Sequence, residues 1–138
     1  QIYNDMFSVN MLFINYKEMV RQGKGKLPFF PKVKQNSRVI IYGAGRVGRH
    51  MLSAIEEKKS FSIVAVADTF PEKYKDSNIW SIEDACKLEY DYVIVASIIS
   101  QHIKQMTEKL LQLNVPVHKI AEFEYENIDF MQQIVKRQ

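Results

Sequence analysis

Three glycines spaced as G-x-G-x-x-G are the residues of this sequence with the most evident chemistry: Gly43, Gly45 and Gly48. In such a turn the first glycine permits a tight bend, the second lets the backbone approach a pyrophosphate, and the third lets helix and strand pack closely. The N–H groups of the next helix, near Arg46 and Val47, would then point at the pyrophosphate, whose charge the helix dipole favours. The motif predicts a phosphate-binding turn, although such turns also serve plain strand-to-helix packing in domains that have lost their ligand.

An acidic residue follows at the distance that a dinucleotide-binding motif requires. Asp68 lies 20 residues after Gly48, at the end of the next predicted strand, where a carboxylate accepts hydrogen bonds from the adenosine ribose. Its charge disfavours the extra phosphate of NADP, and the next residue, Thr69, offers no compensating arginine. We therefore expect NAD rather than NADP, with CoA or a UDP-sugar still open. An aspartate at a strand end also serves as a turn former or a helix cap.

Other polar side chains near these two features are further candidates. Arg46 lies in the turn and Arg49 one helical turn along, and both could reinforce phosphate binding. Ser97 and Ser100 flank the exit of the fourth predicted strand, where an open parallel sheet presents its crevice, although Ser100 also fits a helix cap. The predicted cofactor-binding residues are Gly43, Ala44, Gly45, Arg46, Val47, Gly48, Asp68, Thr69 and Ser97.

Catalytic signatures are hard to find. No tyrosine is followed four residues later by a lysine, the pair that many nucleotide-sugar enzymes use to move a proton. His50, His102 and His118 are scattered and Cys86 is the only cysteine, so the sequence suggests no metal site. His102 near the crevice is a weak candidate for a general base. We assign no catalytic residue, and whether the chain is an enzyme stays open; if it is one, the motifs favour an NAD-dependent oxidoreductase or an epimerase/dehydratase acting on a nucleotide sugar.

The composition is that of an ordinary globular domain. The chain has 138 residues, 46% apolar and 25% charged, which fits one domain and one core. A net charge of +3 is too small to indicate nucleic acid, and no apolar stretch of about 18 residues exists to span a bilayer. The lone Cys86, expected to be a buried and inert thiol, favours a reducing, cytoplasmic setting. Because the sequence begins at Gln1, we expect it to be part of a longer protein.

The elements that must position these residues alternate between strand and helix, which is typical of parallel strands joined by crossover helices. Ser81 and Asp84 form a capping box that should start the second of these helices. Strands are predicted at 39–42, 62–67, 78–80, 92–97 and 119–123, and helices at 46–58, after Ser81, at 100–114 and at 128–135. The predicted fold is therefore α/β: a three-layer, Rossmann-like fold with an open, mostly parallel sheet of about five strands, helices on both faces and a preceding N-terminal helix.

The N-terminal segment differs from the rest. Residues 5–22 show a helical pattern with too many apolar positions for a lone surface helix, so this helix needs a partner: the Rossmann unit, a second copy of the chain or an upstream domain. Between residues 17 and 38, seven basic residues face one acid, and glycines and prolines interrupt any helix, which predicts a solvated connector rather than a surface attracted to anionic lipid. Phe29 and Phe30 should pin it to the core. The predicted division is 1–22 N-terminal helix, 23–37 basic connector and 38–138 Rossmann-like nucleotide-binding domain.

Taken together, residues 28–123 resemble a known type of module: the Rossmann-like NAD(P)-binding domains of bacterial sugar-nucleotide and surface-polysaccharide enzymes. The likeness is carried by the entry segment Leu-Pro-Phe-Phe-Pro at 27–31, the run 39–48 with the glycine turn, and the segments 68–73, 79–85 and 90–96. This resemblance implies that the chain binds NAD(H) or a nucleotide sugar in cell-envelope glycan synthesis. The chain departs from full epimerases because it lacks both the tyrosine/lysine pair and a substrate domain.

Three functions follow for testing. The first is an NAD(H)-binding module that works beside another domain or subunit in sugar metabolism. The second is a self-sufficient nucleotide-sugar dehydrogenase. The third is a non-catalytic interaction module with a vacant nucleotide site, in which the apolar N-terminal helix contacts a homodimer partner or an upstream domain.

Overall fold

The computed structural model describes residues 16–22, 27–58, 61–75 and 78–124. Five strands form its centre: β1 Arg38–Tyr42, β2 Ser62–Asp68, β3 Ile79–Ser81, β4 Tyr92–Val95 and β5 Ile120–Ala121. The helices are α2 Tyr16–Gln22, α3 Arg46–Lys58, α4 Ile82–Ala85 and α5 Ser100–Gln112, with the short 3-10 helices η1 Pro71–Lys73 and η2 Val117–Lys119. The fold is α/β, as the alternation of strand and helix predicts.

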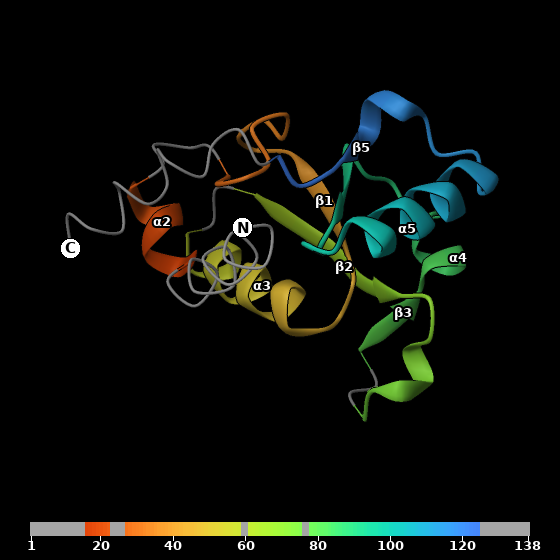
Figure 1. The fold of residues 1–138 in the computed structure, drawn as a ribbon. Coiled ribbons are helices and arrows are strands. Elements are labelled where there is room, and N and C mark those ends of the chain that lie inside the picture. The colour runs from red at the N-terminus through yellow and green to blue at the C-terminus, as the bar shows by residue number, and fades with distance from the viewer. Residues whose placement is uncertain (1–15, 23–26, 59–60, 76–77, 125–138) are drawn as a thin grey trace.

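The strands form one sheet in the order β3-β2-β1-β4-β5, and every neighbouring pair is parallel. The first strand, β1, is therefore central. β2 and then β3 follow on one side of it, and the chain then crosses to the other side of β1, where β4 and β5 lie (Figure 1). Where two neighbouring strands lead away in opposite directions, an open sheet leaves a crevice at its carboxyl edge. In this fold that switch point lies between β1 and β4.

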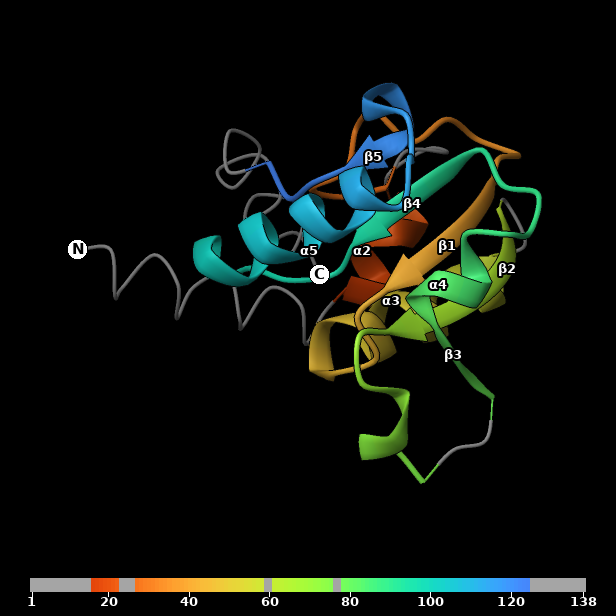
Figure 2. The same ribbon diagram turned by 90° about the vertical axis from the view of Figure 1, so that its right-hand side faces the viewer.

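Helices cover both faces of the sheet, so the fold has three layers (Figure 2). Successive side chains of a strand point to opposite faces of the sheet. In β1 the side chains on both faces are buried after the first residue. Val39 and Ile41 pack in the core beneath α2 and α3, whereas Ile40 and Tyr42 pack in the second core beneath α4 and α5. Because both faces of β1 are covered, its sequence is a continuous apolar run, as expected of a central parallel strand.

Helix α2 packs against α3. Its side chains Tyr16, Met19 and Val20 are buried in the same core as β1. On the exposed side of this contact, Glu57 of α3 forms ion pairs with Lys17 at 3.0 Å and with Arg21 at 2.6 Å. The partner of this helix is therefore the Rossmann unit itself, over the described residues 16–22; the predicted start of the helix at residue 5 lies outside them.

The connector also joins the core. Phe29 and Phe30 are fully buried, and both rings contact Phe123 just beyond β5, with ring centroids 4.9 Å and 6.5 Å apart. The N–H of Glu124 donates to the carbonyl of Phe29 at 3.0 Å. The prediction that the two phenylalanines pin the connector is confirmed. Lys32, although exposed, donates to the carbonyl oxygens of Val117 and Ile120, so part of the basic stretch is bound to the sheet edge and is not a solvated linker.

Several boundaries differ from the prediction. β4 ends at Val95 rather than at residue 97, because the N–H of Ser97 donates to the carbonyl of Val95 and turns the chain. β5 has only two residues, since η2 occupies the start of the predicted strand. The serine half of the capping box is confirmed: the Ser81 hydroxyl accepts the N–H of Asp84 at 3.1 Å. The helix predicted at 128–135 lies outside the described residues.

Candidate functional site

The glycine turn joins the carboxyl end of β1 to the start of α3. Gly43 has φ +120°, a backbone conformation that L side chains rarely adopt, and a Cβ there would approach the carbonyl oxygen of Ala96 to 3.0 Å. Its N–H donates to the carbonyl of Ala67 at 2.8 Å, which continues the β1–β2 ladder into the turn. The first glycine of the motif is therefore required by the bend itself.

The other two glycines have different surroundings. A Cβ on Gly48 would collide with the carbonyl oxygen of Gly43, so the third glycine permits the close approach of helix and turn. A Cβ on Gly45 would find a single heavy atom within 4 Å, the Tyr74 hydroxyl oxygen at 3.9 Å. Apart from this hydroxyl, the space beside Gly45 is open, as it must be on a backbone surface that accepts a phosphate.

Positive charge gathers at the start of α3. The helix begins at Arg46, and the N–H of Arg49 makes the first helical bond, to the carbonyl of Gly45 at 2.9 Å. The N–H groups of a first helical turn have no partner within the helix and carry a partial positive charge. Arg46 and Arg49 are exposed beside them. Burial lowers the pKa of His50, and the charges of the two arginines lower it further.

Asp68 joins the end of β2 to the glycine turn. Its Oδ2 accepts the N–H of Ala44 at 2.9 Å and the hydroxyl of Tyr74 at 3.3 Å, and its Oδ1 accepts the N–H of Phe70 at 3.0 Å. The last bond spans two residues and is the local turn that an aspartate forms at a strand end. The carboxylate therefore lies beside the glycine turn, where the motif needs it, and also shapes the turn after β2.

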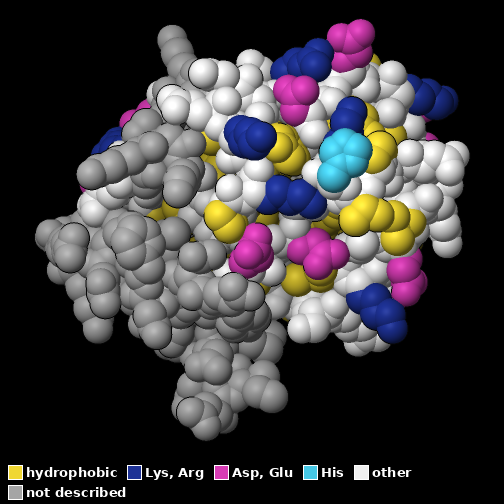
Figure 3. Space-filling model, turned by 90° about the horizontal axis from the view of Figure 1, so that it is seen from above, with side chains coloured by type: hydrophobic (Ala, Val, Ile, Leu, Met, Phe, Trp, Pro, Cys, Tyr) yellow, Lys and Arg dark blue, Asp and Glu magenta, His cyan; other side chains and the backbone are white. Residues whose placement is uncertain are grey.

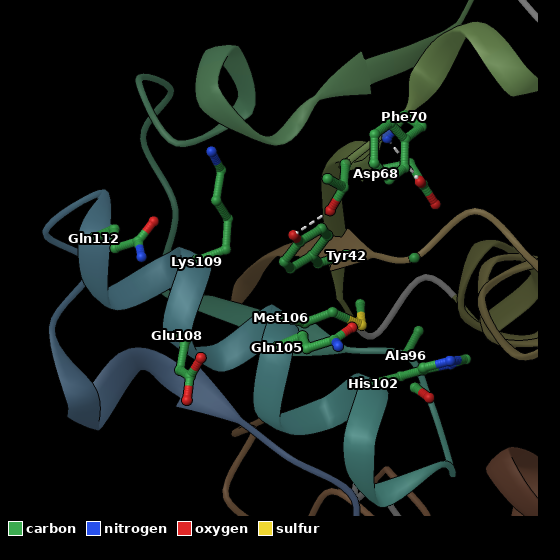
Figure 4. Close-up of a pocket in the computed structure, with 13 residues that line it drawn as sticks. Tyr42, Asp68, Phe70, Ala96, His102, Gln105, Met106, Glu108, Lys109 and Gln112 are labelled. Carbon is green, nitrogen blue, oxygen red and sulfur yellow. Dashed lines mark hydrogen bonds between the residues drawn. The ribbon is translucent and has the colours of Figure 1, made fainter.

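A cavity of about 560 Å³ opens next to this carboxylate, at the carboxyl ends of β1, β2 and β4. One face of α5 forms its opposite wall (Figure 4). The side chains on this wall are His102, Gln105, Met106, Glu108, Lys109 and Gln112. Tyr42, Gly43, Thr69, Phe70, Ala96 and Ser97 complete the lining, so three predicted site residues besides Asp68 meet in one hollow at the switch point of the sheet: Gly43, Thr69 and Ser97. In Figure 4 the carboxylate of Asp68 is directed away from Lys109 and Glu108.

The cavity brings together a tyrosine and a lysine that are far apart in the sequence. The hydroxyl groups of Tyr42 and Thr69 share a hydrogen bond of 2.6 Å, and Lys109 forms an ion pair with Glu83 at 2.9 Å. Burial raises the pKa of Tyr42, the hydrogen bond with Thr69 opposes this, and the charges of Asp68 and Glu83 raise it again. A phenol that serves as a general base needs the opposite shift.

The serines at the exit of β4 have separate roles. Ser97 lines the cavity, and its hydroxyl accepts the N–H of Ile99 at 3.2 Å. The prediction that Ser100 caps α5 is wrong. The cap residue is Ile99 and no side chain caps it, because Ser100 is already the first helical residue. In α5, Leu110 is fully buried, while Ile103, Met106 and Leu113 are partly buried against the core.

Two tyrosines at the site escape a reading of the sequence. Tyr42 directly precedes Gly43 within the apolar run of β1, so it reads as a core residue. Tyr74 lies six residues after Asp68, beyond η1, and belongs to no motif. One signal could have identified Tyr42 as a site residue: it carries a polar hydroxyl at the last position of β1, next to the carboxyl edge of the sheet. The position of Tyr74 depends on how the chain turns after β2, and no local pattern predicts it.

Cys86 and the surface complete the description of the molecule. The Cys86 thiol is half-buried, and burial raises its pKa to about 11, which leaves it protonated and unreactive at neutral pH. Among the described residues, no three side chains of metal-binding type come together. No described helix has the length and apolarity to cross a membrane. On the face shown in Figure 3, basic and acidic side chains alternate with small hydrophobic patches.

Comparison with known proteins identifies the family. No curated protein matches the chain. A family model described as C2185-like, N-terminal, matches residues 35–121. This match runs from just before β1 to the end of β5 and includes the glycine turn, Asp68 and the α5 wall of the cavity. Because the match covers more than half of the sequence, the chain belongs to the C2185-like family, of which it carries the N-terminal domain.

Proposed function

We propose that this chain is an NAD(H)-binding Rossmann-like module. The observation that carries the proposal is the position of one carboxylate: Asp68 accepts a backbone N–H of the glycine turn, at the start of a helix whose first turn carries two arginines. Backbone N–H groups, helix dipole and arginine charge all favour a diphosphate at that place. A neighbouring carboxylate provides the acceptor that a ribose hydroxyl requires.

The geometry suggests how such a ligand would lie. The diphosphate would rest on Gly45 and the first turn of α3, with one ribose toward Asp68. The base of that nucleoside would enter the cavity between Thr69 and Phe70 on one side and α5 on the other. A volume of about 560 Å³ lies within the range of about 300–1,000 Å³ typical of small-molecule sites. Phe70 is 50% exposed at the edge of this cavity; the Lys73 ammonium lies over its ring, 4.8 Å from the centroid, and the opposite face of the ring would be the one to stack on a base.

The acceptor capacity of Asp68 is sufficient for a ribose. A carboxylate offers about four lone-pair positions on its two oxygens. The chain itself uses three of them, through Ala44, Phe70 and Tyr74. Oδ2 is filled by Ala44 and Tyr74, so a ribose hydroxyl reaches this oxygen only when the Tyr74 hydroxyl gives way; the fourth position lies on Oδ1, the oxygen that accepts the N–H of Phe70. A 2′-phosphate would instead bring negative charge against this carboxylate, which is the reason to propose NAD over NADP.

The biological setting rests on the resemblance to domains of bacterial sugar-nucleotide and surface-polysaccharide enzymes. On that basis we propose that the module acts in the cytoplasm, within a larger protein or assembly, in nucleotide-sugar or cell-surface polysaccharide metabolism. A UDP-sugar is the alternative ligand, because it carries the same diphosphate and ribose groups. Lys109 is held by Glu83 and the Tyr42 phenol has a raised pKa, so binding is better supported than independent catalysis.

Isothermal titration of the chain with NAD+, NADH and a UDP-sugar tests the proposal. We expect one of them to bind with a Kd below about 1 mM, which corresponds to about 4 kcal/mol of binding free energy. Gly45→Val should abolish this binding, because the side chain covers the backbone that the diphosphate needs. Ser53→Val adds the same side chain on an exposed position of α3 and should leave binding unchanged. Absence of binding by all three ligands would contradict the proposal.

The second candidate is an interaction module whose nucleotide site is closed. Its support is also specific: Tyr74 occupies an acceptor position on Asp68 and stands over Gly45. Under this candidate neither nucleotide nor nucleotide sugar binds, and substitutions in the glycine turn change stability alone. Size-exclusion chromatography with light scattering, run for the wild type and Gly45→Val, would then give one assembly state for both proteins.

A further inference from the structure

Tyr74 lies beside Gly45, the second glycine of the turn. Its hydroxyl donates to Oδ2 of Asp68 at 3.3 Å, and this oxygen also accepts the N–H of Ala44 from the turn. The same hydroxyl oxygen is the one heavy atom within 4 Å of the place where a Gly45 side chain would begin. One phenol group therefore covers both the acceptor for a ribose and the surface for a diphosphate.

The position of Tyr74 is set by a compact turn. The N–H of Tyr74 donates to the carbonyl of Pro71 at 3.1 Å, and the N–H of Lys73 donates to the carbonyl of Phe70 at 3.1 Å. The segment begins at Asp68 itself, through the bond from the Phe70 N–H to Oδ1. Asp68 thus anchors the start of the turn with one oxygen and receives its end, the Tyr74 hydroxyl, with the other.

The electrostatic surroundings keep the Tyr74 hydroxyl a donor. Partial burial raises the pKa of Tyr74, and the Asp68 carboxylate raises it further through its charge and its hydrogen bond. The positive charge of Arg49 acts in the opposite direction and lowers it. The phenol is therefore protonated at neutral pH, and it offers the carboxylate one O–H donor, as a ribose hydroxyl does.

We propose that Tyr74 determines ligand affinity and selectivity at this site: its hydroxyl holds the ribose position on Asp68 in the free chain and is exchanged for a ligand hydroxyl on binding. The inference rests on the proposed nucleotide binding. A ligand with free ribose hydroxyls replaces the bond that it breaks, so the exchange is nearly balanced. A ligand with a diphosphate and no ribose, such as inorganic pyrophosphate, must displace Tyr74 from Gly45 without replacing its bond to Asp68.

Tyr74→Phe is the decisive variant, because it removes the hydroxyl and retains the ring. In the wild type, NAD+ must break the bond between Tyr74 and Asp68; in the variant that bond is gone. A hydrogen bond to a charged group is stronger than one between neutral groups, and the partial exposure of this one reduces its contribution. We expect NAD+ to bind about three- to thirtyfold more tightly to Tyr74→Phe than to the wild type, as measured by isothermal titration.

Tyr90→Phe is the matched control. It removes a phenol hydroxyl before β4, outside the lining of the cavity, and should leave the Kd for NAD+ unchanged. Inorganic pyrophosphate serves as the second probe. In the wild type it should bind at least tenfold more weakly than NAD+, and Tyr74→Ala, which also uncovers Gly45, should narrow that difference.

The outcomes separate the inference from the proposed function. If Tyr74→Phe binds NAD+ more tightly than the wild type and Tyr90→Phe does not, the exchange at Tyr74 and the proposed nucleotide binding are both supported. Both are also supported if the Tyr74 variants bind NAD+ and the wild type does not. If the wild type binds NAD+ and Tyr74→Phe binds it equally well or more weakly, the proposed exchange is overturned, but the proposed nucleotide site is not. Absence of binding by the wild type, Tyr74→Phe and Tyr74→Ala overturns both. A carbon-13 signal from the Tyr74 ring that stays unshifted at saturating NAD+ also overturns the exchange.

Discussion

The Oδ2 atom of Asp68 accepts the backbone N–H of Ala44 at 2.9 Å, and this bond ties the end of β2 to the glycine turn after β1. A bond within the chain therefore holds the shape of the turn, through the same carboxylate that we propose to contact a ribose. Preorganisation of this kind reduces the free energy spent on ordering a loop when a ligand binds. It also gives Asp68 a structural role that can be measured without any ligand.

Asp68→Ala should lower the free energy of unfolding by about 1–3 kcal/mol. The substitution leaves the N–H groups of Ala44 and Phe70 without their acceptors, and an unsatisfied donor costs about that much. Urea denaturation followed by circular dichroism measures the change. Asp84→Ala is the control, because that carboxylate is exposed and pairs with Lys87 at 3.4 Å, a contact worth less than about 1 kcal/mol. Equal effects of the two variants would contradict the role given to Asp68.

Two glycines of one motif should respond differently to substitution. Gly48→Ala places a Cβ against the carbonyl oxygen of Gly43, and we expect it to destabilise the fold by about 3 kcal/mol or more. Gly45→Ser meets open space and puts a good cap residue before α3, so its effect on stability should stay within about 0.5 kcal/mol. Thermal denaturation compares them. Comparable losses would show that the turn is tighter at Gly45 than its surroundings indicate.

Helix α2 should be held by apolar packing and not by its ion pairs. Met19 is fully buried between α2 and the core, and Met19→Ala should reduce the unfolding free energy by about 2–4 kcal/mol. Glu57→Gln removes the ion pairs with Lys17 and Arg21, but Glu57 is 42% exposed and its loss should have an effect below about 1 kcal/mol. Guanidinium denaturation ranks the two variants. A larger loss for Glu57→Gln would refute this account.

The start of β1 should contribute to acid sensitivity. Arg38 donates to the Asp91 carboxylate from its backbone and its side chain, and these bonds hold the pKa of Asp91 below its ordinary value of 3.8. A carboxylate whose pKa is lower in the folded state than in the unfolded state stabilises the protein at pH values above its unfolded pKa. This stabilisation is lost as the pH falls through the folded pKa. The Tm advantage of the wild type over Asp91→Asn should therefore be full above pH 4 and shrink below it. Glu56→Gln, an exposed acid on α3, serves as the control, and an advantage that persists at pH 2 would rule out this linkage.

The sequence alone determined the features that depend on neighbouring residues. The alternation of apolar runs and helical stripes predicts the parallel α/β sheet, since periodicity reflects which faces of an element are buried. The spacing of Gly43, Gly45 and Gly48 predicts the turn, because Gly43 and Gly48 each meet a local steric requirement of the bend. The cap formed by Ser81 and Asp84 spans three residues and was equally readable. The failed cap at Ser100 shows the limit, because a helix start depends on where the preceding strand lets the chain turn.

The tertiary structure alone decided how the site is lined and covered. Strand order and register bring Asp68, Ala96 and the α5 wall to one edge of the sheet, although they come from separate crossover units. Tyr74 reaches Asp68 through a turn whose course no local pattern predicts. The two-residue strand β5 exists through its pairing with β4, and α2 found its partner in α3. Contacts between residues distant in sequence depend on the packing of whole elements, and the physical chemistry of a short segment contains no information about that packing.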